Sequence, residues 1–477
     1  MTIFFCAEIN ALLFSVFFLF ISLLQNAFGV ERHYSFYLIL MLSANLCVTS
    51  FFFPGSYSLF SSFTLEGGPS TIMLKSLFAI LMFVFFVFLL VANYNWDEFE
   101  SERGFLYLVI FTSGLFLTGT KDPLTVFIFI EIVSLASFGL IAINKTRYAY
   151  EAATKYLIFS SIASCFFIMS FITAGHGVYK IDSGLLNHYA IFFPNNIGAL
   201  GWTSLSETLL AAAFFIKFGL GPFSGWLVDA YEAAKYRDFV FLSTVGKLPL
   251  VVAFAQIFTG VTNDFLRYFF VTFLFCFAIG ASVLMVKQKK ARRFFAYSGL
   301  FNYALGFILF FSANSAHFLV VKYFIYYTVI GLLTYIAFDL YRNYSADKQE
   351  PSFISELPRF GQVGPAVCFG TALILSSGLP PLGIFLMKAF AFGFFMVGSS
   401  YADLTGLLLT TFFFLILSIV NMFAYFKVFA NTLSFTNSPT SRIYTVRHSA
   451  NLAQTYLFSV LFLFFIPLNY YWMYFVR

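Results

Sequence analysis

Long stretches of apolar residues, separated by short polar segments, follow one another along almost the whole chain. A helix needs about 20 apolar residues to cross the ~30 Å hydrocarbon core of a bilayer. Stretches of this length recur fourteen times, so the pattern predicts an all-α membrane protein of about 14 transmembrane helices. The predicted spans are residues 4 to 28, 35 to 53, 71 to 93, 104 to 120, 122 to 142, 152 to 174, 205 to 226, 238 to 260, 265 to 286, 294 to 313, 316 to 340, 363 to 396, 404 to 430 and 453 to 475.

Lysine and arginine residues lie mostly in alternate loops between these spans. The loops after even-numbered helices contain three of them, Lys121, Lys180 and Arg267. The loops after odd-numbered helices contain sixteen: Arg32, Arg103, Lys145, Arg147, Lys235, Arg237, Lys287, Lys289, Lys290, Arg292, Arg293, Arg342, Lys348, Arg359, Arg442 and Arg447. By the positive-inside rule, the odd-numbered loops face the compartment of synthesis and both termini face the opposite side. A miscounted helix would remove this asymmetry, so the charges support the helix count independently of hydropathy.

The composition excludes a soluble protein. Of the 477 residues, 60% are hydrophobic and 10% are charged, whereas soluble domains have about 25% charged residues. The net charge of +6 comes from the loops, where it is an orientation signal and not a nucleic-acid surface. The 74 phenylalanines indicate the coding bias of an AT-rich genome, and the first residues resemble neither a signal peptide nor an import peptide. We therefore expect the chain to be encoded in an organelle.

The five cysteines are scattered along the chain. They form no CxxC motif and have no histidine at ligand spacing. We therefore expect no metal or iron–sulfur site and no cofactor in this chain. The cysteines are Cys6, Cys47, Cys165, Cys276 and Cys368.

Four ionisable residues lie deep within predicted spans: Glu131, Lys217, Lys247 and Lys388. A charge at the bilayer centre costs at least about 2.5 to 3.5 kcal/mol, so it usually faces protein or water and has a partner. A glutamate and a lysine on neighbouring helices neutralise each other. When the glutamate moves away, desolvation favours the neutral amine, and the lysine can release its proton. The four residues are therefore suited to moving protons, although static structural pairs are an alternative interpretation.

Glycine and proline residues interrupt two of the lysine-containing spans. Lys217 is followed by FGLGPF, and Lys388 is preceded by SSGLPPLG at residues 376 to 383. Broken helices occur at membrane depth only where they pack in protein or line a hydrated cavity. Paired interruptions are typical of transporters built from repeats, although an ordinary packing kink is the alternative for either site alone. The residues of the predicted breaks are Gly219, Gly221, Pro222, Pro380 and Pro381.

Four segments match the sequence pattern of one known family. Residues 217 to 247, KFGLGPFSGWLVDAYEAAKYRDFVFLSTVGK, align without gaps to K-x-x-x-x-PFHxWxPDVYEGAPTPVxxFLSTVxK. The helix that contains Glu131, GTKDPLTVFIFIEIVSLASFGLIA, also matches. Residues 291 to 300, ARRFFAYSGL, and 377 to 388, SGLPPLGIFLMK, are similar to two further helices. These segments resemble the antiporter-like subunits of respiratory complex I, most closely the subunit-2 branch, and the resemblance covers about residues 100 to 430.

The resemblance implies a fold of two inverted five-helix repeats, helices 4 to 8 and 9 to 13, in which helices 7 and 12 are broken. The implied domains are residues 1–103, 104–262, 263–431 and 432–477. It also implies roles. Glu131 and Lys217 form the pair whose separation controls proton release, Lys247 is the connecting proton carrier, and Lys388 is the terminal exchange site.

The chain departs from the family pattern at several positions. Ser224 replaces the PFH histidine, Val228 replaces the PD proline, and AKYR at residues 234 to 237 replaces APTP. In the tenth helix, where relatives often have His or Gln, stands Asn302, which does not titrate near neutral pH. A proton that passes there is expected to travel by water.

His317 and Lys322 in the eleventh span are candidates for restoring the missing titratable group, although a surface role is favoured for His317. Tyr323, Tyr326 and Tyr327 are expected to be packing residues and not proton relays.

The resemblance implies a proton-translocating membrane-arm subunit of complex I that binds no redox cofactor, NADH or quinone. The implied partners are other membrane-arm subunits, including subunit 4 and the small subunit 4L, together with lipid but not nucleic acid. The implied location is the mitochondrial inner membrane, with the odd-numbered loops toward the matrix and both termini toward the intermembrane space. The alternatives are a cation/proton antiporter subunit and a non-pumping structural subunit.

Overall fold

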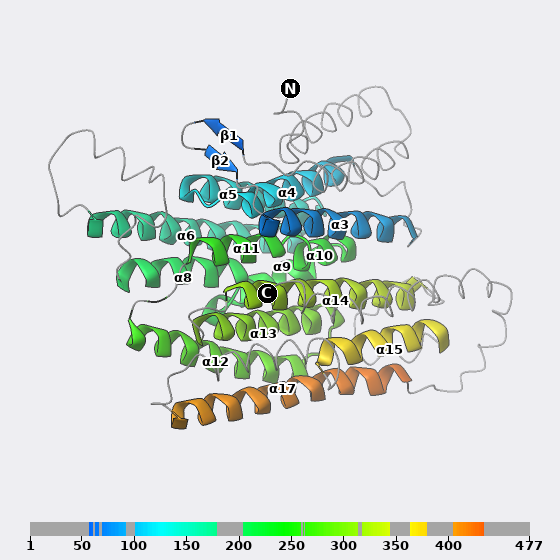
Figure 1. Cartoon of the computed structure of the whole chain (residues 1–477). Coiled ribbons are helices and arrows are strands. Elements are labelled where there is room, and N and C mark those ends of the chain that lie inside the picture. Colours follow the sequence, from blue (N-terminus) through cyan, green and yellow to red (C-terminus); the bar gives the residue numbers. More distant parts are fainter. Residues whose placement is uncertain are drawn as a thin grey trace, which may run out of the picture. The chain divides into compact units, whose positions relative to one another are not determined.

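Helices make up nearly all of the described part of this computed structural model (Figure 1). The structure describes residues 57–60, 63–65, 69–91, 101–178, 204–258, 261, 263–312, 317–343, 363–378 and 404–433. The predicted spans 4 to 28, 35 to 53 and 453 to 475 lie outside these residues, as do Pro380, Pro381 and Lys388. The chain divides into two compact units, Met1–Phe275 and Cys276–Arg477.

The described part of the first unit begins with a short antiparallel hairpin, an exception to the all-α prediction that lies between two predicted spans. Its strands are β1 (Tyr57–Phe60) and β2 (Phe63–Leu65). The helices that follow are α3 (Pro69–Val91), α4 (Ser101–Gly119), α5 (Pro123–Ala142), α6 (Arg147–Val178), α8 (Ser204–Phe218), η4 (Gly221–Phe223), α9 (Gly225–Ala233), α10 (Tyr236–Ser243), α11 (Leu248–Ile257) and the first half of α12 (Asp264–Lys287).

Helix α5 begins with a strong local start signal. The Asp122 carboxylate accepts a hydrogen bond from the Thr125 backbone N–H at 3.0 Å, and Pro123 occupies the first turn, where no backbone donor is needed. This start agrees with the predicted span of residues 122 to 142. It fixes the position of Glu131 about two turns into the helix.

Aromatic contacts join the helices of the first unit. Helix α6 packs against α5 and α8, and α4 packs against α5 and α11. Phe116 stacks on Phe129 between α4 and α5 at 4.3 Å, and Phe214 meets Phe254 between α8 and α11 at 4.9 Å. Each such ring pair adds about 0.5 to 1.5 kcal/mol beyond the burial of its area. Helices α5, α6 and α8 therefore form a packed group that can hold buried polar side chains in fixed positions.

Breaks are seen in the structure within the predicted spans of residues 205 to 226 and 238 to 260. The span of residues 205 to 226 ends as an α-helix at Phe218 and continues through η4 into α9. The span of residues 238 to 260 is divided into α10 and α11 by a turn over residues 244 to 247. An unbroken eighth helix was predicted, so this second interruption corrects that prediction. Pro249 explains part of it, because proline favours the first turn of a new helix.

Within its described residues, the second unit contains the rest of α12 together with α13 (Ala291–Ser312), α14 (His317–Asn343), α15 (Val363–Ser377) and α17 (Leu404–Leu433). Helix α14 packs against α13 and α15, and α15 packs against α17. Gly306 of α13 lies directly against the Phe324 ring of α14, where a Cβ atom would fall 2.2 Å from the ring. This glycine therefore permits the close approach of the two helices.

Six stretches among the described residues are long and apolar enough to cross a membrane. They are Pro123–Ala142, Arg147–Ala174, Tyr236–Ile257, Asp264–Lys287, Ala291–Phe311 and Val320–Asp339. Together with 60% hydrophobic residues, they make the chain a multi-span helical membrane protein. Several of the described basic residues that were assigned to loops instead lie at helix ends. Arg103 and Arg237 lie in the first turns of α4 and α10 and are buried, and Arg147 and Lys287 are the first residue of α6 and the last residue of α12.

Candidate functional site

Lys217 in the last turn of α8 has all of its ammonium hydrogens in use. It donates to Glu131 Oε1 at 3.0 Å, to Ser134 Oγ at 2.8 Å and to Ser160 Oγ at 2.7 Å. An ammonium group has three N–H donors and no acceptor. The lysine is buried within the unit, so these partners replace the water that a charged amine otherwise requires. The site is built to hold a protonated lysine in an apolar interior.

Glu131 occupies the middle of α5 and is less deeply buried than its lysine partner, with 29% of its side chain exposed. The Ser164 hydroxyl donates a hydrogen bond to Glu131 Oε1. Ser164 and Ser160 lie one turn apart on α6, so one face of that helix contacts both members of the ion pair. The pair and its three hydroxyl groups therefore come from three different helices, which relative helix movement would separate.

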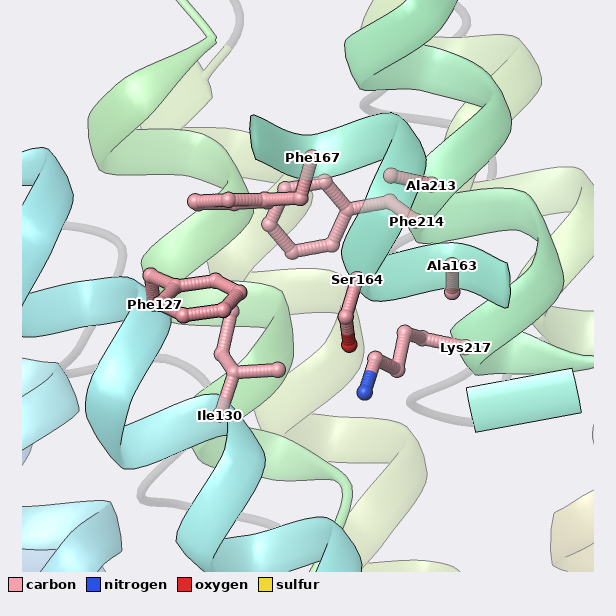
Figure 2. A pocket seen from close by; sticks show the side chains of 8 residues that line it. All are labelled: Phe127, Ile130, Ala163, Ser164, Phe167, Ala213, Phe214 and Lys217. Carbon is pink, nitrogen blue, oxygen red and sulfur yellow. The ribbon is translucent and has the colours of Figure 1, made fainter. Parts of the chain in front are cut away.

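A small pocket lies beside this ion pair (Figure 2). In Figure 2 the Ser164 hydroxyl and the Lys217 amine point into the same space, beside the rings of Phe127, Phe167 and Phe214. Ile130, Ala163 and Ala213 complete the lining. The polar atoms thus lie at one end of an otherwise apolar pocket, where few waters could enter.

The interruption after Lys217 uses two glycines in the left-handed region, Gly219 with φ 73° and Gly221 with φ 78°. The Gly219 N–H donates to the Ile216 carbonyl at 2.9 Å, and the Leu220 N–H donates to the Phe215 carbonyl at 2.7 Å. These two bonds form a Schellman motif, which closes a helix at its carboxyl end. The motif does not use the Lys217 carbonyl, which remains available as an acceptor.

Lys247 takes that carbonyl. Its Nζ donates to the Lys217 backbone oxygen at 2.6 Å and lies 5.3 Å from the Phe218 ring and 5.9 Å from the Trp226 ring. A helix carboxyl end carries a partial negative charge, and aromatic faces attract cations. The helix break therefore has a chemical role, since it turns the end of α8 into a binding site for the second lysine. The two lysines are connected through the backbone of Lys217 itself.

Substitution of Gly219 by alanine is expected to destabilise the chain. A side chain at this left-handed position costs about 1 to 2 kcal/mol, and a shifted break would also move the Lys217 carbonyl away from Lys247. The measurement is the amount of folded chain recovered from the membrane at raised temperature. The control is Gly280→Ala in α12, where an added Cβ meets open space and a helical alanine is favoured. Equal recovery of both variants would contradict the expectation.

The second unit contains the other predicted polar residues. Asn302 is fully buried; its Nδ2 donates to the Ser298 carbonyl at 2.9 Å, and its Oδ1 accepts from the Tyr323 hydroxyl at 3.1 Å. Tyr323 was predicted as a packing residue, and it is also a hydrogen-bond donor. Lys322 is buried in α14, and His317 is the first residue of that helix.

Three serines of the site were not predicted from the sequence: Ser134, Ser160 and Ser164. A signal was present, because Ser134 follows Glu131 by three residues and the other two serines are four apart, so each pair shares a helix face. The relative rotation of α5, α6 and α8 was needed to bring these faces together. Among the described residues, no three His, Cys, Asp or Glu side chains could together hold a metal ion.

The chain is similar to known proteins both in sequence and in fold. Residues 120–414 match the family model described as NADH:quinone oxidoreductase/Mrp antiporter, transmembrane. The NADH-quinone oxidoreductase subunit N of Campylobacter jejuni is 26% identical over 379 residues, covering 78% of this chain and 76% of that protein. The NADH-ubiquinone oxidoreductase chain 2 of Dictyostelium discoideum is 26% identical over 278 residues, covering 56% of this chain and 55% of that protein.

Two solved structures share the fold. A chain of the archaeal membrane-bound sulfane sulfur reductase superposes with a TM-score of 0.75 at 17% identity, covering 98% of this chain and 96% of that chain. A chain of respiratory complex I from Thermus thermophilus superposes with a TM-score of 0.69 at 17% identity, covering 97% of this chain and 98% of that chain. The chain therefore shares the fold of these two chains.

Proposed function

The chain belongs to the NADH:quinone oxidoreductase/Mrp antiporter transmembrane family, and from this premise we propose that it is a proton-translocating membrane-arm subunit of a complex-I-type NADH:quinone oxidoreductase. Its relatives are named as subunits of that enzyme. The observation that carries the proposal is the buried ammonium of Lys217, bonded to Glu131 and two serines, with Lys247 bonded to its carbonyl.

Proton transfer in this proposal begins at the Glu131–Lys217 pair. While the carboxylate lies beside Lys217, the ammonium is neutralised and keeps its proton. When α5 and α8 move apart, Lys217 loses both Glu131 and Ser134, which lie on α5, and its ammonium retains the Ser160 hydroxyl of α6. Its proton then leaves to water and the amine becomes neutral. Lys247, when neutral, accepts a proton, because two neighbouring ammonium charges disfavour each other. When α5 and α8 close again, the returning Glu131 carboxylate favours the charged form of Lys217, which takes a proton from water, and Lys247 then gives its proton to water because two neighbouring ammonium charges disfavour each other. Each lysine thereby returns to its starting charge.

The finer parts of the proposal concern the whole chain. We propose fourteen helices arranged as two inverted repeats, residues 104–262 and 263–431, with Lys388 as the terminal exchange site and Asn302, bridged by water, between the repeats' lysines. The chain holds no redox cofactor, so that oxidoreduction belongs to partner subunits. Support comes from the family pattern at Lys217, Lys247 and Lys388.

The partners and location follow from the same premise. We propose other complex I membrane-arm subunits as partners, among them subunit 4 and the small subunit 4L. The proposed location is the mitochondrial inner membrane, with the odd-numbered loops toward the matrix, because sixteen basic residues lie in or beside those loops, against three in or beside the even-numbered loops. Isolation of the native assembly and identification of its companions would test this assignment.

Substitution of Glu131 by glutamine in the assembled complex tests the function. Glutamine keeps a hydrogen-bond acceptor for Ser164 and Lys217 but removes the charge, so we expect fewer protons translocated per electron while NADH oxidation continues. The matched control is Glu151→Gln, which removes a carboxylate from an exposed pair with Lys155. Undiminished pumping by Glu131→Gln would favour a structural subunit that keeps its charges without using them.

A cation/proton antiporter is the second candidate, because the matching family also includes Mrp antiporters. Vesicles that contain the chain distinguish the two functions. Sodium-driven proton movement in the absence of NADH oxidation would favour the antiporter, whereas proton movement only in the assembled complex and only with NADH and quinone supports the subunit.

A further inference from the structure

A second buried ion pair lies in the first unit, apart from the Glu131–Lys217 site. Arg103 in the first turn of α4 donates to Asp238 in the first turn of α10, and both side chains are fully buried. The Tyr107 hydroxyl donates to the other Asp238 oxygen. Arg103 also donates to Asn144 Oδ1 at 2.8 Å. Both oxygens of the buried carboxylate therefore have partners.

This cluster connects four segments that are distant in the sequence. Asn144, in the turn between α5 and α6, donates through Nδ2 to the carbonyl of Ala233 at the end of α9 at 3.1 Å. The Tyr107 ring lies 4.6 Å from the Phe241 ring of α10 and 5.5 Å from the Phe85 ring of α3. The start of α10 is thus fixed against α4, the α5–α6 turn and the end of α9. We call Arg103, Tyr107, Asn144 and Asp238 the α10 anchor.

Helix α10 needs such external contacts because it is short and interrupted. It has eight residues and is followed by the turn at residues 244 to 247. In that turn the Gly246 N–H donates to the Phe241 carbonyl at 2.9 Å and the Lys247 N–H donates to the Thr244 carbonyl at 3.3 Å. Lys247 is therefore attached to the far end of α10, and a shift of α10 moves its amine relative to the Lys217 carbonyl.

The sequence at the start of α10 also supports an external anchor for this helix. Where the family pattern has the two prolines of APTP, which restrict the backbone, this chain has Lys235 and Arg237, and the following Val of the pattern is Asp238. A buried ion pair is a poor source of stability, since apolar residues of similar volume often serve as well, but it can fix one arrangement of helices. In this chain one member of the ion pair, Asp238, directly follows the positions where the pattern has its two prolines.

We propose that Arg103 and Asp238 are positioning residues that hold α10 so that Lys247 reaches the Lys217 carbonyl. This inference rests on the proposed function, because its effect is read as proton pumping. It adds a role for two residues that do not themselves exchange protons. Loss of the anchor lets α10 shift, lengthens the bond from Lys247 to Lys217 and lowers the efficiency of proton transfer between the lysines.

The decisive variant is Arg103→Met/Asp238→Val in the assembled complex. It removes both charges of the pair together, so neither Arg103 nor Asp238 is left as the unpaired buried member of that pair. We expect normal amounts of complex and normal NADH oxidation with a loss of protons translocated per electron, and Asp238→Asn is expected to show the same loss. The matched control is Asp264→Asn, which breaks an Arg–Asp pair at the start of α12 whose carboxylate side chain is 84% exposed. It is expected to pump as the unmodified complex does.

A combined variant separates positioning from general stability. If the anchor acts through Lys247, then adding Asp238→Asn to Lys247→Met produces no further loss of pumping. Normal pumping by assembled Arg103→Met/Asp238→Val, or losses that add in the combined variant, would overturn the inference while leaving the proposed function intact. Normal pumping by Lys247→Met alone would instead overturn the proposed function.

Discussion

Replacement of Lys217 by methionine is expected to slow proton transfer through this chain by about 10² or more, the range seen when a positioned proton-transfer group is removed. Methionine has similar length but no proton to exchange, and it leaves Glu131, Ser134 and Ser160 without their donor. The measurement is the number of protons translocated per electron by the assembled complex in vesicles. The rate of NADH oxidation, measured in parallel, reports whether the complex is intact.

The variant Lys217→Arg shows whether the positive charge at this position is sufficient or whether the side chain must also exchange a proton. Lys217→Arg keeps a positive charge beside Glu131 but does not lose its proton in proteins, and its planar group does not fit three separate acceptors. Both Lys217→Arg and Lys217→Met are therefore expected to translocate fewer protons per electron than the unmodified complex. The control is Lys155→Met, because Lys155 makes a comparable bond to Asp229 at 3.1 Å in a partly exposed position. Normal pumping by Lys217→Met would identify the buried pair as a static contact.

Much of the fold was predictable because bilayer thickness constrains helix length. The predicted span 122 to 142 corresponds to α5 at Pro123–Ala142, and the span 294 to 313 corresponds to α13 at Ala291–Ser312. Polar first turns were harder to assign. Helix α6 begins at Arg147, whereas the apolar pattern predicted residue 152. Hydropathy registers the hydrocarbon core, while the helix continues into the polar interface.

The ion pair was easier to predict than its surroundings. Charged residues are rare in apolar spans, so Glu131 and Lys217 were visible in the sequence, and the structure places their side chains 3.0 Å apart. Serines are common in transmembrane helices, and only the rotation of α5 and α6 shows which of them face the lysine. The role of each residue in proton transfer stays a prediction.

Two features of the first unit depended on tertiary contacts. Arg103 was assigned to a loop because it borders a span, but its partner Asp238 lies 135 residues away, and sequence distance gives no indication of such a pair. The turn at residues 244 to 247 was also not predicted. Gly246 and Pro249 are present there, but the surrounding apolar residues continue the hydropathy pattern of a single span.

Replacement of Lys247 by methionine is expected to reduce proton transfer to a similar degree, about 10² or more, with a smaller effect on assembly than Lys217→Met. Lys247 is surrounded by Phe218 and Trp226, an apolar environment that accepts a methionine side chain. Its loss leaves one helix-end carbonyl unbonded and no carboxylate uncompensated. Protons per electron and the amount of assembled complex are the two measurements.

The matched control is Lys427→Met, because Lys427 also donates to a helix-end carbonyl, that of Val286 at 3.0 Å, but at an exposed position. If a fixed charge at the end of α8 were sufficient, Lys247→Arg would pump normally while Lys247→Met would not. If Lys247 must gain and lose a proton, both Lys247→Arg and Lys247→Met translocate fewer protons per electron, because arginine keeps its proton in proteins. The second outcome is supported by the bond that Lys247 makes to the Lys217 carbonyl at the helix break. A backbone carbonyl is neutral, so it opposes proton release from the ammonium less than a carboxylate does.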